Sequence, residues 1–299
     1  MREQIMKCLG RFPEKCDLEL KKISEEDCGD YTRQLIEYQT ESGERVQSYL
    51  LVPHNLKGKN PAVLAIHQHA GKWHLGKSEV VGLAGDPMFS YGLDLVKRGY
   101  VVIAPDLLCF ESRIEERFND SKAGQSDYER YEFLKRVQYG SCLQTKYLHD
   151  LSVALDVLEA LDYVDTNRIG AIGHSLGGQE TVWITWYDKR IKAAVSSCGV
   201  GSVASIFDHR VLHCFALYVP GLGNVCDMDE VIKEISPRAL MITSGLRDEA
   251  HFPLDGIDKI EEANRQSRNF KSVRFDDGHK LNDTEKDTAY SWLDDKLNT

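Results

Sequence analysis

Short apolar runs alternate with amphipathic, helix-length stretches along most of the chain. The apolar runs predict strands at residues 62–67, 100–106, 168–173, 191–197, 239–244 and 272–275. The stretches between and after them predict helices at residues 89–98, 144–161, 178–186, 254–267 and 283–297. A run such as 62–67, apolar at nearly every position, is typical of a strand buried on both faces of a sheet. The alternation predicts an α/β fold with a mostly parallel central sheet and helices on both faces.

The first sixty residues follow a different pattern. Residues 31–39 and 45–52 alternate apolar and polar positions around the turn at 41–44, which predicts an antiparallel hairpin. Residues 1–30 are charged and mixed, and we expect them to form a helical arm of one or two helices, either packed on the domain or placed in a dimer contact. No linker divides the rest, so residues 31–299 are expected to form one domain.

Two stretches interrupt the strand–helix repeat. Residues 107–143 carry nearly balanced charges with three tyrosines, whereas residues 198–230 are richer in apolar side chains. Ligands of open α/β sheets bind beyond the carboxyl ends of the strands. Both insertions are therefore candidates for a lid and a substrate pocket, and the alternative is that they are surface elaborations without a catalytic part.

Composition limits the classes of partner. The formal net charge is −10, with both signs spread along the chain, which argues against a nucleic-acid or anionic-membrane partner. The first ten residues hold no apolar core of signal-peptide length and no run is long enough to span a bilayer, so we expect a cytoplasmic protein. The eight scattered cysteines favour reduced thiols. A homo-oligomer stays open.

The strand at 168–173 leads directly into Gly173-His-Ser-Leu-Gly177. This sequence matches the nucleophile elbow G-x-S-x-G, in which a strained turn between a strand and a helix exposes a serine hydroxyl to a base. The glycines Gly173 and Gly177 would let the strand and the helix approach closely. Ser175 is therefore the candidate nucleophile, and the amide of Leu176 would point at the developing oxyanion.

A serine nucleophile needs a histidine base and an acid that orients it, and in this fold they follow in the order Ser, acid, His. Asp248 lies in the loop after the strand at 239–244, and His279 lies just past the strand at 272–275. Both would open onto the same sheet edge as Ser175. His251 follows Asp248 too closely in sequence to be expected as its partner across two loops.

A second oxyanion amide is expected from the loop after the strand at 62–67. We favour the backbone amide of His69, with Gln68 as the runner-up, while the histidine side chains there are expected to pack or to hydrogen-bond locally. Gln68 and Trp73, together with Tyr218 in the second insertion, are the candidates for substrate contacts.

With these pieces assembled, the chain resembles the α/β-hydrolases, and within them the branch of dienelactone hydrolases and acetyl xylan esterases. The motifs that carry the resemblance are His67-Gln-His-Ala-Gly71, Gly173-His-Ser-Leu-Gly-Gly178, Tyr218-Val-Pro-Gly221 with Ser236-Pro-Arg-Ala-Leu240, Gly245-Leu-Arg-Asp248 with Pro253, and Gly278-His279 followed by Trp292-Leu293. The resemblance implies hydrolysis of a small-molecule carboxylic ester, without metal or organic cofactor, by the triad Ser175, Asp248 and His279.

The chain also departs from this branch. Its candidate nucleophile is serine, where true dienelactone hydrolases use cysteine, and we expect no signal peptide, unlike in secreted xylan esterases. An amidase or peptidase of the same fold stays open, as does a non-catalytic binding module. A metal-dependent hydrolase is a further alternative, because His67, His69 and His74 could form a set of ligands.

Overall fold

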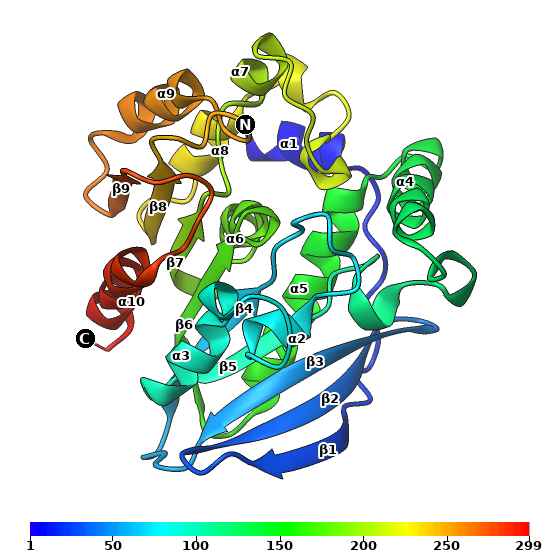
Figure 1. Cartoon of the computed structure of the whole chain (residues 1–299), viewed down its shortest axis with the longest axis vertical. Helices are drawn as coiled ribbons and strands as arrows, with labels where there is room; N and C mark the ends of the chain where they lie inside the picture. The colour runs from blue at the N-terminus through cyan, green and yellow to red at the C-terminus, as the bar shows by residue number, and fades with distance from the viewer. Residues whose placement is uncertain (299) are drawn as a thin grey trace.

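A computed structural model describes residues 1–298 and contains one nine-stranded sheet with helices on both faces (Figure 1). The strands are β1 (Lys21–Asp27), β2 (Tyr31–Glu41), β3 (Glu44–Pro53), β4 (Asn60–Ile66), β5 (Val101–Pro105), β6 (Val164–His174), β7 (Ile191–Ser197), β8 (Ala239–Gly245) and β9 (Phe270–Phe275). The α-helices are α1 (Arg2–Leu9), α2 (Lys77–Val80), α3 (Tyr91–Lys97), α4 (Lys122–Gln138), α5 (Leu143–Ala160), α6 (Leu176–Tyr187), α7 (Val203–Asp208), α8 (Met228–Lys233), α9 (Leu254–Asn264) and α10 (Asp283–Leu297). Short 3-10 helices lie at Pro87–Phe89, Glu111–Arg113, Glu116–Phe118, Phe215–Leu217 and Leu222–Asn224.

The sheet has the order β1-β2-β3-β5-β4-β6-β7-β8-β9. The pairs from β5 and β4 through β9 are parallel, whereas β1, β2 and β3 pair antiparallel and β3 joins β5 antiparallel. The predicted fold class, the predicted hairpin and each of the predicted parallel strands are therefore confirmed. Parallel strands here bury both faces, because α5 and α6 pack on one face while α3 and α10 pack on the other.

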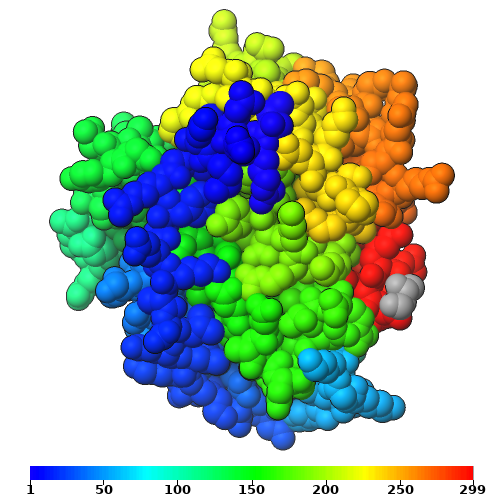
Figure 2. All heavy atoms as spheres, turned by 180° about the vertical axis from the view of Figure 1, so that it is seen from behind, coloured from blue at the N-terminus to red at the C-terminus, as the bar shows by residue number. Residues whose placement is uncertain are grey.

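The N-terminal segment packs on the domain, which is one of the two arrangements considered from the sequence. Ile5 and Leu9 of α1 are fully buried, and the Arg2 guanidinium donates to the carbonyl oxygens of Trp186 and Tyr187 at 2.8 and 2.7 Å. Figure 2 shows this dark blue segment lying across the back of the molecule, against the yellow part of the chain.

The expectation of a helical arm over residues 1–30 is wrong for residues 21–27. They form the edge strand β1, whose residues are all exposed and which pairs with β2. A charged, fully exposed strand has no buried face and therefore no alternation of apolar residues, and its strand conformation depends on backbone pairing with β2.

Both predicted insertions lie outside the repeat. Residues 107–143 contain two 3-10 helices and α4, and residues 198–230 contain α7, two further 3-10 helices and the beginning of α8. None of the helices formed within residues 1–298 combines the length and the apolar character that a bilayer crossing requires.

Candidate active site

The turn between β6 and α6 places Ser175 in a strained conformation. Its φ and ψ are 54° and −120°, a region that a residue with a side chain rarely adopts without support from its surroundings. The surroundings are tightly packed, because a Cβ built on Gly173 would lie 2.2 Å from the Gly177 carbonyl oxygen. A Cβ on Gly177 would lie 2.0 Å from the Ile66 carbonyl oxygen at the end of β4. The glycines therefore permit the close approach that the sequence pattern predicted.

Gly177→Ala is expected to lower the free energy of unfolding by about 1–3 kcal/mol, because the new methyl group meets backbone that cannot move aside. The measurement is a guanidinium denaturation midpoint at constant m-value. Gly223→Ala is the matched control, since a Cβ there meets no atom of residues 1–298 within 4 Å. Equal midpoints for the two variants would contradict the packing argument.

The carboxyl ends of β8 and β9 bring an acid and a base together. The carboxylate Oδ2 of Asp248 accepts a hydrogen bond of 2.7 Å from Nδ1 of His279. The two loops are tied to each other, because Arg247 N donates to the Asp277 carbonyl oxygen and a Cβ on Gly245 would lie 2.2 Å from the Gly278 carbonyl oxygen. Since Nδ1 of His279 is the donor, its Nε2 is the nitrogen left to accept a proton.

Asp248 is 2% exposed and ionised. Burial alone would raise the pKa of Asp248, but hydrogen bonds from His251 and His279 outweigh it and hold this pKa below its ordinary value. His174 packs against His279 at 4.7 Å between ring centroids, and burial keeps the pKa of His174 well below its usual range. The imidazole of His279 therefore lies between a buried anion and a neutral ring that limits its rotation.

His251 is the second donor to Asp248. Its Nδ1 lies 2.8 Å from Oδ1 of the carboxylate. The sequence argument excluded His251 only as a partner across two loops, and this contact lies within a single loop. The three-residue separation closes a turn in which the His251 amide donates to the Asp248 carbonyl oxygen at 3.0 Å. This turn brings the imidazole back over the carboxylate.

One pocket of about 350 Å³ joins these elements. Ser175, Leu176 and His279 line it together with Gln68, His69 and Trp73 from the loop after β4. Ser175 and His279 face this common space and are not hydrogen-bonded to each other in the described part of the chain. Both insertions contribute walls, through Ser126 and Glu129 of α4 and through residues 212–215.

Glu129 fixes the loop that follows β4. Its Oε2 accepts from Nε2 of His69 at 2.9 Å and from Nε1 of Trp73 at 2.8 Å, and its side chain is 2% exposed. Nδ1 of His69 accepts from the Gly71 amide, which leaves the proton of the neutral ring on Nε2. The sequence reasoning missed Glu129, because a glutamate in a charged helix looks like part of a solvated face.

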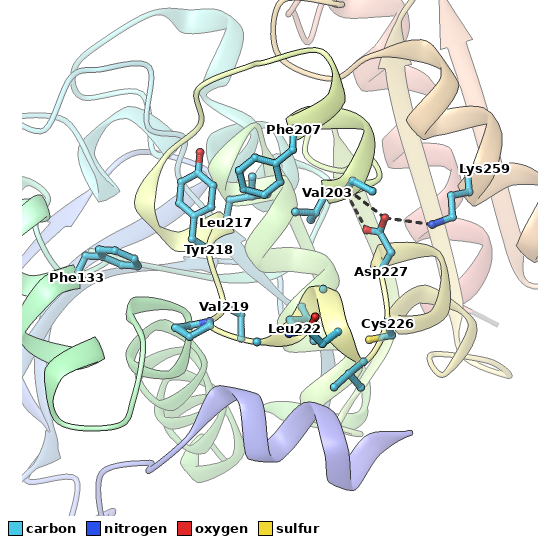
Figure 3. Close-up of a pocket in the computed structure, with 16 residues that line it drawn as sticks. Phe133, Val203, Phe207, Leu217, Tyr218, Val219, Leu222, Cys226, Asp227 and Lys259 are labelled. Carbon is cyan, nitrogen blue, oxygen red and sulfur yellow. Dashed lines mark hydrogen bonds and ion pairs between the residues drawn. The ribbon is translucent and has the colours of Figure 1, made fainter.

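The three residues predicted to contact substrate lie in two different pockets. The Gln68 side chain lines the pocket of Ser175 and donates to Glu79 at 3.0 Å, and Trp73 lines the same pocket. Tyr218 instead lines a second pocket of about 720 Å³, with Phe133 and Phe207 nearby (Figure 3). Its hydroxyl accepts from the amide of His213, which belongs to the wall of the first pocket.

His67, His69 and His74 do not converge on a common point. The only group of three potential metal ligands within residues 1–298 is Cys198, Asp248 and His279. His67 donates from Nδ1 to the Gln68 carbonyl oxygen and accepts at Nε2 from the Leu107 amide, so both of its nitrogens are occupied.

Comparisons with known proteins agree with this architecture. The model of the dienelactone hydrolase family matches residues 46–268. The putative hydrolase YtaP of Bacillus subtilis is 29% identical over 272 residues, which cover 87% of this chain and 84% of that protein.

Two solved structures have the same fold. A putative acetyl xylan esterase from Bacteroides fragilis superposes with a TM-score of 0.73 at 17% identity, covering 91% of this chain and 73% of that one. A glucuronoyl esterase from Solibacter usitatus superposes with a TM-score of 0.68 at 16% identity, covering 99% and 92%. The match to the family model extends over most of the sheet and over both insertions, and the chain therefore belongs to the dienelactone hydrolase family.

Proposed function

We propose that the protein is a serine hydrolase that cleaves carboxylic esters of small molecules, with short acyl or acetyl groups, through an acyl-enzyme. The hydrogen bond between buried Asp248 and His279, in a pocket that Ser175 lines from a strained turn, carries this proposal. A volume of about 350 Å³ suits a small substrate. One solved structure of the same fold is a putative acetyl xylan esterase.

In this mechanism Nε2 of His279 removes the proton of Ser175 as its oxygen attacks the ester carbonyl. Asp248 keeps the proton of the resting imidazole on Nδ1 and stabilises the imidazolium that forms. The imidazolium then gives its proton to the leaving alcohol. Water attacks the acyl-enzyme in the same way, and Ser175 is released.

The oxyanion would be held by the amides of Leu176, at the first turn of α6, and of His69, in the loop after β4. Each such donor contributes roughly 2.7–4 kcal/mol to the stability of the transition state in comparable sites. The Leu176 amide is fixed by the elbow, whereas the loop of His69 depends on its contact with Glu129. Glu129 is accordingly a positioning residue.

Glu129→Ala is expected to lower kcat/KM for p-nitrophenyl acetate by about 10- to 100-fold, because the loop of His69 and Trp73 loses its shared acceptor. The control is Glu132→Ala on the same helix, where the carboxylate pairs with Lys135 and Arg136 outside the pocket. A loss in kcat/KM that is matched by the control would contradict a specific role for Glu129.

A fluorophosphonate probe tests the proposed function directly. Intact-mass and peptide analysis should find one adduct for each chain, on Ser175, because only an activated serine reacts at neutral pH. Failure of the probe to label Ser175 would favour a non-catalytic binding module. Parallel assays with p-nitrophenyl acetate and p-nitroacetanilide would separate an esterase from an amidase, and we expect turnover of the ester.

A further inference from the structure

The carboxylate of Asp248 is shared by two imidazoles. Oδ2 accepts from Nδ1 of His279 at 2.7 Å, and Oδ1 accepts from Nδ1 of His251 at 2.8 Å. The two rings are stacked, with centroids 4.1 Å apart and an angle of 22° between their planes. The proposed catalytic cycle uses only His279, so the second imidazole has no assigned role.

The two histidines differ in their access to water. The side chain of His251 is 51% exposed, whereas that of His279 is 18% exposed. The hydrogen bond to Asp248 raises the pKa of His251, and partial burial opposes this rise. The buried carboxylate of Asp248 can stabilise one positive charge on the two imidazoles. A second proton would put two cations in stacked rings, with one carboxylate between their donor nitrogens.

Three buried titratable groups near the pair, His174, His213 and Cys198, are neutral in the relevant pH range. Burial holds the pKa of His174 well below its usual range, and burial together with the neighbouring histidines lowers the pKa of His213 to about 4. Burial raises the pKa of the Cys198 thiol. Lys280, beside His279 in sequence, is half-exposed and pairs with Asp277. The charge of Asp248 is therefore the dominant one that either imidazole meets.

We propose that His251 is a positioning residue that accepts a proton from solvent in preference to His279, and so keeps the catalytic base neutral at lower pH. This inference rests on the proposed function, in which His279 is the base. As the pH falls, His251 becomes charged first, its charge offsets that of Asp248, and a proton on His279 becomes less favourable. The enzyme therefore stays active further into the acid range than a triad with a single imidazole would.

His251→Gln tests the proposal, because a glutamine side chain retains a donor for Oδ1 and cannot take up a proton. The acid limb of the pH profile of kcat/KM for p-nitrophenyl acetate should move upward by about 0.5–1 pH unit, while the plateau near pH 8 stays within about 3-fold of the wild type. His251→Phe, which keeps a stacked ring without charge, should shift the limb in the same direction. His54→Gln is the control, since His54 contacts Thr32 far from the pocket and should leave the profile unchanged.

Two results would overturn the proposal. An acid limb at the same pH in both His251 variants would show that the second imidazole does not influence the base. A loss of plateau activity as large as that of His279→Gln would show that His251 itself acts as the base. Imidazole NMR titration provides a measurement that is independent of turnover: the His279 signal should titrate at higher pH in His251→Gln than in the wild type. If the wild type hydrolyses no ester, the proposed function fails. The NMR titration still shows in that case whether the charge of His251 affects protonation of His279.

Discussion

Ser175→Ala is expected to reduce kcat/KM for p-nitrophenyl acetate by about 10⁴- to 10⁶-fold, the largest effect of any single substitution in this chain. The substitution removes the atom that would bond to the acyl carbon. It leaves the elbow glycines, the amide of Leu176 and the pair of Asp248 and His279 in place. The residual rate would come from the oxyanion amides and from binding alone. Steady-state kinetics with purified variants, together with circular dichroism for folding, measure this loss.

Ser126→Ala is the matched control. Ser126 lies on α4 and lines the same pocket as Ser175, yet it follows no strained turn and has no place in the proposed mechanism. We expect its kcat/KM to stay within a few-fold of the wild type. Ester turnover that persists in Ser175→Ala at a rate near that of Ser126→Ala would refute an acyl-enzyme on Ser175, and the proposed function with it.

The parts of the fold that carry a local signal could be predicted from the sequence. Residues 62–67 are apolar at nearly every position because β4 is covered by helices on both faces, and the hairpin of β2 and β3 alternates because its two faces differ. The elbow could be found because its glycines are required by contacts at about 2 Å between backbones. Asp248 and His279 follow from the rule that parallel strands end at one edge of the sheet.

The parts that depend on distant packing could not be predicted. The carboxylate of Glu129 contacts His69 and Trp73 from a helix more than fifty residues away, and nothing in the charged sequence of α4 distinguishes it from its exposed neighbours. Tyr218 lies among apolar residues, as the composition of residues 198–230 indicated. The path of these residues nevertheless places it in the second pocket, of about 720 Å³, and not in the pocket of Ser175. Insertions have no repeating pattern, so their side chains can be assigned to a site only from coordinates.

His251 differs from these cases, because its signal was present in the sequence. A histidine three residues after an aspartate can return to it within one turn, as the bond from the His251 amide to the Asp248 carbonyl oxygen shows. The separation that excludes a partner across two loops allows one within a single loop. The acid of the candidate triad therefore has two partners, and this changes what its substitution should do.

Asp248→Asn is expected to lower kcat for p-nitrophenyl acetate by about 10⁴-fold. The carboxylate offers one acceptor oxygen to each imidazole, whereas an asparagine side chain offers one acceptor and one donor. One histidine must therefore move its proton to Nε2. If this is His279, its Nε2 can no longer accept the proton of Ser175, and the imidazolium also loses the negative charge that stabilises it.

Asp276→Asn is the control, because Asp276 lies in the loop of His279 and its exposed side chain pairs with Arg247. We expect kcat to stay within a few-fold of the wild type there. A small loss in Asp248→Asn, comparable to this control, would mean that His251 is the ring that moves its proton to Nε2. It would also mean that catalysis does not need the negative charge of Asp248. The double variant Asp248→Asn with His251→Phe resolves that case, since a single imidazole then faces the amide. Recovery of kcat in the double variant relative to Asp248→Asn would show that competition between the two rings, rather than the lost charge, limits the base.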